Sequence, residues 1–159
     1  MSLEQSLKDF FGVGDRRVVV MGVGSLNGDD RIGPKIIELL ESKSMSDVLL
    51  INAESTPESF TGKVEAFNPT HVLILDAADF HGSPGDTKLI SKEEIRGQAV
   101  STHKLPLSLF MHFIEESMSL SIVVLGVQPI SVAFWAPLSE KLEATAVSIA
   151  NTLYQVLSE

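Results

Sequence analysis

Three polar residues, Asp30, Asp76 and His103, lie far apart in the sequence but have the side-chain types that hydrolytic chemistry needs. Two carboxylates and one imidazole suit a divalent ion such as nickel or zinc and leave coordination positions open for a substrate or water. A carboxylate could also act as the general base for an attacking water. The long gaps between the three contain no local metal-binding motif, so the fold must bring them together.

Each of these residues also has a purely structural interpretation. Asp30 precedes an amphipathic run and could cap a helix, Asp76 could bond backbone amides at a strand end, and His103 could be a solvated loop residue. The sequence has no cysteine, which excludes thiolate catalysis and cysteine-based zinc sites. Nothing in it resembles the nucleophile elbow of a serine hydrolase.

The elements that must position these side chains alternate between strands and helices. Strands are predicted at 18–21, 48–51, 72–75, 87–90 and 122–125, and all of these except the half-polar run at 87–90 are apolar runs typical of buried strands. The connection between the third and fourth runs is too short for a helical crossover, so we expect the fourth strand to be an antiparallel edge strand. The carboxyl ends of the remaining strands are expected to build the site at one rim of the sheet.

Amphipathic runs predict the helices between and around these strands. Residues 3–11 and about 30–42 form two of them, with Pro34 in the first turn of the second. Another helix opens at Pro106, and the last begins at Ser139. We expect the helix from Pro106 to turn four apolar side chains inward: Leu109, Phe110, Phe113 and Ile114.

Composition restricts the class of protein. The chain has 159 residues, 44% of them apolar, and a net charge of −9 from 12 basic and 21 acidic residues. Such a charge disfavours binding to nucleic acid and to anionic membranes. No run reaches the roughly 18 apolar residues of a membrane span, and we see no secretory signal. We therefore expect a cytoplasmic protein.

Two glycines after the first strand, Gly22 and Gly24, suggest a dinucleotide-binding loop, but the third glycine of that fingerprint is missing from its usual place. Asp29 and Asp30 then stand where a pyrophosphate would bind at a helix N-terminus. Two negative charges beside a diphosphate oppose its binding and favour a cation. A Rossmann-like module that binds a nucleotide or small ligand without catalysis is thus a weaker alternative.

Four motifs in series carry a specific resemblance: MGVGSLNGDD at 21–30, LDAAD at 75–79, THKLPL at 102–107 and LGVQP at 125–129. Their order and spacing resemble those of the [NiFe]-hydrogenase maturation endopeptidases, most closely the formate-hydrogenlyase (hydrogenase 3) type. The resemblance covers about residues 17–157. It implies a three-layer α/β/α sandwich with a five-stranded, mostly parallel sheet. We expect a single domain over 1–159, with residues 1–16 as an N-terminal extension and 17–157 as the peptidase domain.

The resemblance also implies an activity. Members of this family remove a C-terminal extension from the large-subunit precursor of a hydrogenase once nickel has been inserted. The family's metal-binding positions fall on Asp30, Asp76 and His103, which would contact nickel supplied by the substrate. Zinc or cadmium could occupy the same site in a crystal. We expect Asp30 and Asp76 to be catalytic, and Gly126 and Gln128 to shape the substrate cleft.

Two departures from the family pattern affect substrate choice more than fold. Arg31 follows the acidic pair where relatives carry a small residue, and Asn52 stands where they carry an aspartate. Glu54, two residues further on, could supply the missing charge in the cleft. The attacking water could be activated by the nickel or by a carboxylate. We expect a monomer, and a metal-dependent hydrolase of small amides remains a further alternative.

Overall fold

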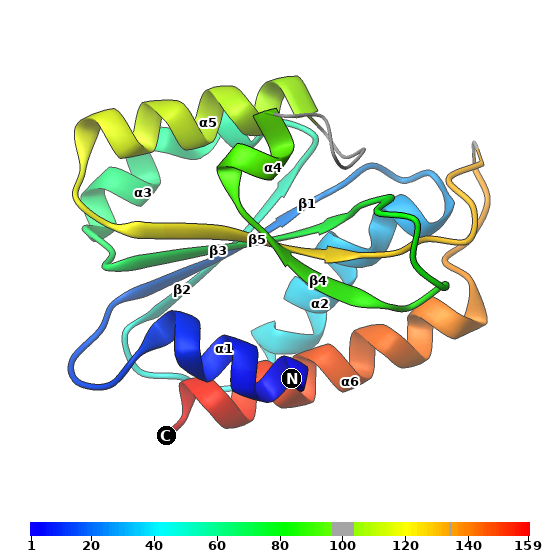
Figure 1. Cartoon of the computed structure of the whole chain (residues 1–159), viewed down its shortest axis with the longest axis horizontal. Helices are drawn as coiled ribbons and strands as arrows, with labels where there is room; N and C mark the ends of the chain where they lie inside the picture. Colours follow the sequence, from blue (N-terminus) through cyan, green and yellow to red (C-terminus); the bar gives the residue numbers. More distant parts are fainter. Residues whose placement is uncertain (97–103, 134) are drawn as a thin grey trace.

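The computed structural model describes residues 1–96, 104–133 and 135–159, and it contains one five-stranded sheet with helices on both faces (Figure 1). The strands lie in the order β2-β1-β3-β5-β4. Their bounds are β1 Val18–Val23, β2 Val48–Glu54, β3 His71–Ala77, β4 Thr87–Ile90 and β5 Ser121–Val127. Among the strand pairs that the structure describes, only β4–β5 is antiparallel, which confirms the prediction from the short connection that precedes β4.

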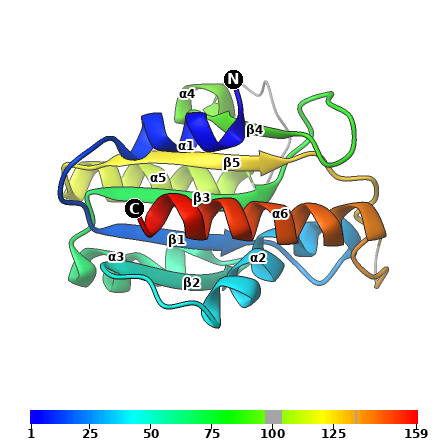
Figure 2. The ribbon, with the colours of Figure 1, turned by 90° about the horizontal axis from the view of Figure 1, so that it is seen from below.

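Helices complete the three layers (Figures 1 and 2). One face of the sheet is covered by α1 Leu3–Phe11, α2 Ile32–Glu41 and α6 Glu140–Leu157. The other is covered by α3 Thr61–Phe67, α4 Lys92–Arg96 and α5 Lys104–Ser117. This is the α/β/α sandwich that the motif resemblance implies. Within the described ranges, no helix has the length and apolar content that a membrane crossing requires.

Strand β1 lies between the two helical layers, and its side chains alternate between them. Val18 and Val20 belong to the core on the side of α1, α2 and α6. Val19 and Met21 belong to the core on the side of α3, α4 and α5. Because both faces are covered, every residue of β1 is buried. An unbroken apolar run is therefore what this strand requires.

The inward face of α5 differs from the predicted one. Phe110 and Ile114 are buried as expected, but Leu109 and Phe113 are more than half exposed. The buried stripe contains Leu107, Phe110, Met111 and Ile114, which follows the spacing of one helical face. Apolar residues occur on two adjacent faces of this helix, so their periodicity alone does not decide which face the sheet covers.

Helix α1 contributes to the core through Leu7 and Phe11, which are buried beside α6. The His71 ring at the start of β3 lies edge-on to the rings of Phe10 and Phe11, at 5.3 and 5.8 Å between centroids. Burial lowers the pKa of His71, and the positive charge of Arg16 lowers it further. The folded protein thus favours the neutral imidazole.

Candidate active site

The β1–α2 connection, residues 24–31, packs closely against its own backbone. A side chain at Gly24 would collide with the carbonyl oxygen of Asp30. Gly28 has a left-handed φ of 54°, and a Cβ there would lie 2.5 Å from the carbonyl oxygen of Ser131. A 3-10 turn over Gly28–Arg31 precedes α2, which begins two residues later than predicted. These close approaches determine where the two acids of the turn lie.

Asp30 lies beside a cavity at the carboxyl end of the parallel strands. One carboxylate oxygen, Oδ2, accepts hydrogen bonds from the backbone N–H of Ser25 at 2.8 Å and from its hydroxyl at 2.6 Å. Asp30 does not cap α2, since Arg31 occupies the N-cap position. The cavity measures about 560 Å³ and is lined by Ser25, Asn27, Asp30, Ala77, Ala78, Asp79, Gln128, Pro129, Ile130, Ser131 and Val132.

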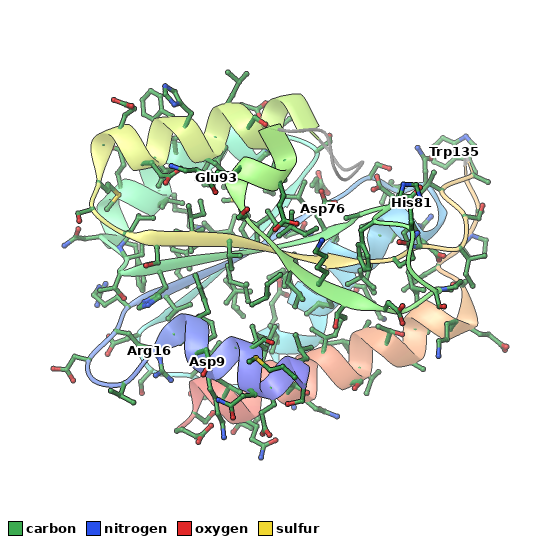
Figure 3. All side chains as sticks on the ribbon, viewed as in Figure 1. Asp9, Arg16, Asp76, His81, Glu93 and Trp135 are labelled. Carbon is green, nitrogen blue, oxygen red and sulfur yellow. The ribbon has the colours of Figure 1, made fainter. Side chains whose placement is uncertain are left out.

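Asp76 is the penultimate residue of β3 and is fully buried. Strand alternation places it on the same face as Val72 and Ile74, which is the face that α3, α4 and α5 cover (Figure 3). The two residues that follow it, Ala77 and Ala78, line the cavity beside Asp30. The structure thus brings the end of β3 to the cavity that contains Asp30.

The third predicted ligand, His103, lies outside the described residues. Among the residues that the structure describes, no three His, Cys, Asp or Glu side chains are grouped so that they could hold a metal ion. His81, which also follows the LDAAD motif, is largely exposed, with its Nδ1 3.9 Å from Asp79 Oδ1. The assignment of Asp30, Asp76 and His103 as metal ligands therefore stays a prediction.

Asp29 has a role that the sequence did not indicate. It is 1% exposed, and its carboxylate accepts backbone hydrogen bonds from Ile130, Ser131 and Ser139. Burial alone would raise its pKa, but the hydrogen bonds from Ser139, Ile130 and Ser131 outweigh that effect and lower it. Asp29 is thus a charged anchor for the β5–α6 loop. Two identical side chains in succession gave no sign of which one faces the loop.

Gln128 holds the other loop at this rim. Its Oε1 accepts from the backbone N–H groups of Phe80 and Gly82, both at 3.0 Å, and its Nε2 donates to Asp79 Oδ1 at 3.1 Å. The pKa of Asp79 is lowered by the hydrogen bond from the His81 backbone and by the one from Gln128. Gln128 therefore fixes the β3–β4 loop while also lining the cavity beside Asp30.

Gly126 and Glu54 occupy different surroundings. Gly126 is buried in β5 opposite Asp76, and a Cβ there would lie 2.5 Å from Ile90 Cδ1 and 2.9 Å from Ala78 Cβ.

Glu54 is exposed and has a φ of 52°. It lines a second cavity, of about 670 Å³, that also contains Arg31 and Asn52. The two cavities share Ser25, so Glu54 lies next to the Asp30 cavity and not inside it.

Comparison with known proteins identifies the family to which the chain belongs. A family model described as hydrogenase maturation protease matches residues 34–156. The chain is 29% identical over 141 residues to the hydrogenase 3 maturation protease of Escherichia coli, covering 87% of each chain. It is 33% identical over 153 residues to a Methanocaldococcus jannaschii protein that carries the provisional name hydrogenase maturation protease, covering 91% of this chain and 90% of that one.

A solved structure supports the same assignment. The crystal structure of HycI, a [NiFe] hydrogenase maturation protease from Thermococcus kodakarensis, matches 97% of this chain and 99% of its own, with 35% identity and a TM-score of 0.89. These findings confirm the resemblance carried by the four motifs, and they favour an endopeptidase over a binding module or a small-amide hydrolase. The chain belongs to the hydrogenase maturation protease family.

Proposed function

We propose that this protease removes a C-terminal extension from the large-subunit precursor of a [NiFe]-hydrogenase after nickel has been inserted. The names of the Escherichia coli and Thermococcus kodakarensis relatives support a hydrogenase as the substrate. The observation that carries the proposal is the position of Asp30. Two hydrogen bonds from Ser25 orient its carboxylate beside a cavity that the end of β3, directly after Asp76, also lines.

In this proposal the nickel is part of the substrate. Asp30, Asp76 and His103 would contact the ion that the precursor already holds, through two carboxylates and an imidazole. The ion would then bridge enzyme and precursor, and cleavage would depend on loading because the unloaded precursor lacks that bridge. The carboxylate of Asp30, already held by Ser25, could bind the ion with little reorganisation.

Hydrolysis requires a water molecule to attack the carbonyl carbon of the scissile peptide. The water gives one proton to a base, the C–N bond breaks, and the leaving nitrogen takes up a proton. Asp30 or Asp76 would act as that base. Coordination to the nickel of the substrate would lower the pKa of the water and give a second route to the same attack.

We further propose that the enzyme is a cytoplasmic monomer and that residues 1–159 form one domain. In that view residues 1–16 extend the peptidase domain of 17–157. Helix α1 supports this proposal, since Leu7 and Phe11 share a core with α6. Sedimentation of the purified chain tests the oligomeric state, and removal of residues 1–16 tests whether the rest still folds and cleaves.

The test of the function uses purified enzyme with matched nickel-loaded and nickel-free precursor, and intact-mass spectrometry of the products. We expect the loaded precursor to lose a C-terminal peptide and the nickel-free precursor to keep its full mass. Equal cleavage of both forms would remove nickel from recognition. Failure to cleave either form would reject the proposed substrate.

A further inference from the structure

The two acids of the 3-10 turn over Gly28–Arg31 point to different partners. Asp30 binds Ser25, whereas Asp29 binds the described part of the β5–α6 loop, residues 128–133 and 135–139. Both carboxylate oxygens of Asp29 are used: Oδ2 accepts from Ile130 N at 2.7 Å and from Ser131 N at 3.2 Å, and Oδ1 accepts from Ser139 N at 2.8 Å. One buried side chain thus holds the loop near both of its ends.

Backbone hydrogen bonds join the same two segments. Asp29 N donates to Ser131 O at 2.7 Å, and Gly28 N donates to Ala136 O at 2.9 Å. Because Asp29 and Asp30 are consecutive residues of one turn, the position of the β5–α6 loop relative to Asp30 is set by these contacts. Burying a carboxylate is costly unless it is fully hydrogen-bonded, and the loop amides meet that requirement here.

The loop carries apolar side chains at the edge of the cavity beside Asp30. Ile130 and Val132 line that cavity and are nevertheless 55% and 54% exposed. Leu26 and Trp135, on the same two connected segments, are also more than half exposed. Figure 3 shows Trp135 at the same end of the molecule as His81. Exposed apolar side chains gathered beside a cleft are typical of surfaces that bind another polypeptide.

We infer that Asp29 is a positioning residue, whose carboxylate holds the β5–α6 loop so that Ile130 and Val132 form an apolar wall for the polypeptide substrate beside Asp30. This inference rests on the proposed function, because it assigns the wall to the precursor. The wall is continuous with the cavity in which the scissile peptide would lie, which favours the precursor over a second copy of this chain as its occupant. Asp29 itself would touch neither the peptide nor the nickel.

The first test measures kcat and KM of Asp29→Ala on nickel-loaded precursor. A displaced wall weakens substrate binding, so we expect KM to rise about tenfold while kcat changes less than about twofold. Asp29→Asn keeps one acceptor oxygen, so its KM should lie between those of the wild-type enzyme and Asp29→Ala. Val64→Ala, a buried substitution on α3, serves as the destabilised control and should leave the KM of the folded enzyme unchanged.

A role for Asp29 limited to stability would give a different pattern. Asp29→Ala would then resemble Val64→Ala, with an unchanged KM once the folded fraction is taken into account, and this result would overturn the inference. Amide hydrogen exchange provides a second readout. We expect the amides of Ile130, Ser131 and Ser139 to exchange faster in Asp29→Ala than in Val64→Ala.

A second test, with a double variant of the loop and a control on α6, can be interpreted whether or not Asp29→Ala folds. Ile130→Ser combined with Val132→Ser changes only exposed side chains and keeps the backbone N–H groups that bind Asp29. We expect its KM for the precursor to rise about tenfold, whereas Val147→Ser, on the exposed face of α6, should leave KM unchanged. Precursor cleavage with an unchanged KM in the double variant overturns this inference alone.

Two other outcomes are distinguishable from that result. A wild-type dimer that the double variant converts to a monomer would assign the wall to a second copy of the chain and would also overturn the inference. Failure of the wild-type enzyme to cleave nickel-loaded precursor would overturn the proposed function, and the assignment of the wall to the precursor with it.

Discussion

Ser25 and Asp30 are joined by two hydrogen bonds to one carboxylate oxygen, from the serine N–H at 2.8 Å and from its hydroxyl at 2.6 Å. The pair closes the loop that leaves β1 and holds Asp30 at the edge of the cavity. Hydrogen bonds to a charged group are stronger than those between neutral groups. The orientation of Asp30 therefore depends on a residue five positions earlier.

Ser25→Ala tests that dependence. The variant loses the hydroxyl donor and keeps the N–H donor, so Asp30 remains in place with less restraint. We expect kcat/KM for nickel-loaded precursor to fall by about tenfold to a hundredfold, since a hydrogen bond to a charged group contributes about 1.5–3 kcal/mol. Ser42→Ala, which removes a hydroxyl bonded to Leu39 O at the end of α2, is the control. A kcat/KM equal to that of the control would show that the hydroxyl has no role.

Gln128 donates a hydrogen bond to Asp79, and substitutions can exchange the donor and acceptor roles of the two side chains. Gln128→Ala removes the acceptor for the N–H groups of Phe80 and Gly82, and we expect it to lower the free energy of unfolding by about 1–3 kcal/mol. Gln128→Glu keeps the acceptor but places a carboxylate against Asp79. Combining it with Asp79→Asn removes the repulsion between the two carboxylates and restores a donor and acceptor pair, and it should recover part of the loss, because the same Asp79 oxygen also accepts from His81 N–H.

A double-mutant cycle measured by urea denaturation checks this prediction. The coupling between Gln128→Glu and Asp79→Asn should be favourable, so that the double variant is more stable than the sum of the single variants predicts. Additive effects would mean that the contact between Gln128 Nε2 and Asp79 Oδ1 does not contribute to the stability of the loop.

His71 makes stability depend on pH. Its pKa in the folded protein is lowered from 6.5 by burial and by Arg16, so the unfolded chain binds the proton more readily. The stability contributed by the neutral ring is present above pH 6.5 and is lost as the pH falls toward the lower folded pKa. We expect the urea concentration at the unfolding midpoint to decrease when the pH is lowered from about 7.5 to about 5.5. The midpoint of His71→Gln should decrease less over the same pH range. Parallel pH profiles for the two proteins would contradict this account.

Gly28 and Gly62 provide opposite expectations for the same substitution. At Gly28, with φ of 54°, a Cβ would lie 2.5 Å from Ser131 O, so we expect Gly28→Ala to destabilise the fold by about 1–3 kcal/mol. At Gly62, inside α3, a Cβ would meet nothing within 4 Å, and Gly62→Ala should stabilise by about 0.5–1 kcal/mol. Thermal unfolding measures the change in stability of both variants. A stabilising effect of Gly28→Ala, like the one expected for Gly62→Ala, would contradict the close packing of the Gly28 loop.

The fold was largely predictable because its strands are buried on both faces. Val18–Met21 needs an apolar residue at every position, and a run of that kind is visible in the sequence. The edge position of β4 followed from the length of a connection. The inward face of α5 was not predictable from periodicity, since Leu109 and Phe113 have the same spacing as the buried Phe110 and Ile114.

The candidate site was predictable only in part. Asp30 and the end of β3 meet at one rim because the carboxyl ends of parallel strands meet there. The roles of Asp29 and Gln128 were hidden, because their partners are backbone N–H groups about 50 to 110 residues away in the chain. Side-chain type alone does not reveal such contacts, and Asp29 cannot be told from Asp30 without the geometry of the turn.

The central claim is that Asp30 and Asp76 act directly on the nickel-loaded substrate. The most direct measurement is the rate at which Asp30→Asn and Asp76→Asn, each with the wild-type circular dichroism spectrum, cleave nickel-loaded precursor. Asparagine keeps the shape of the side chain but loses its charge and basicity, so we predict that each rate falls by about a hundredfold or more. Cleavage by either folded variant at the wild-type rate would contradict the role assigned to that residue.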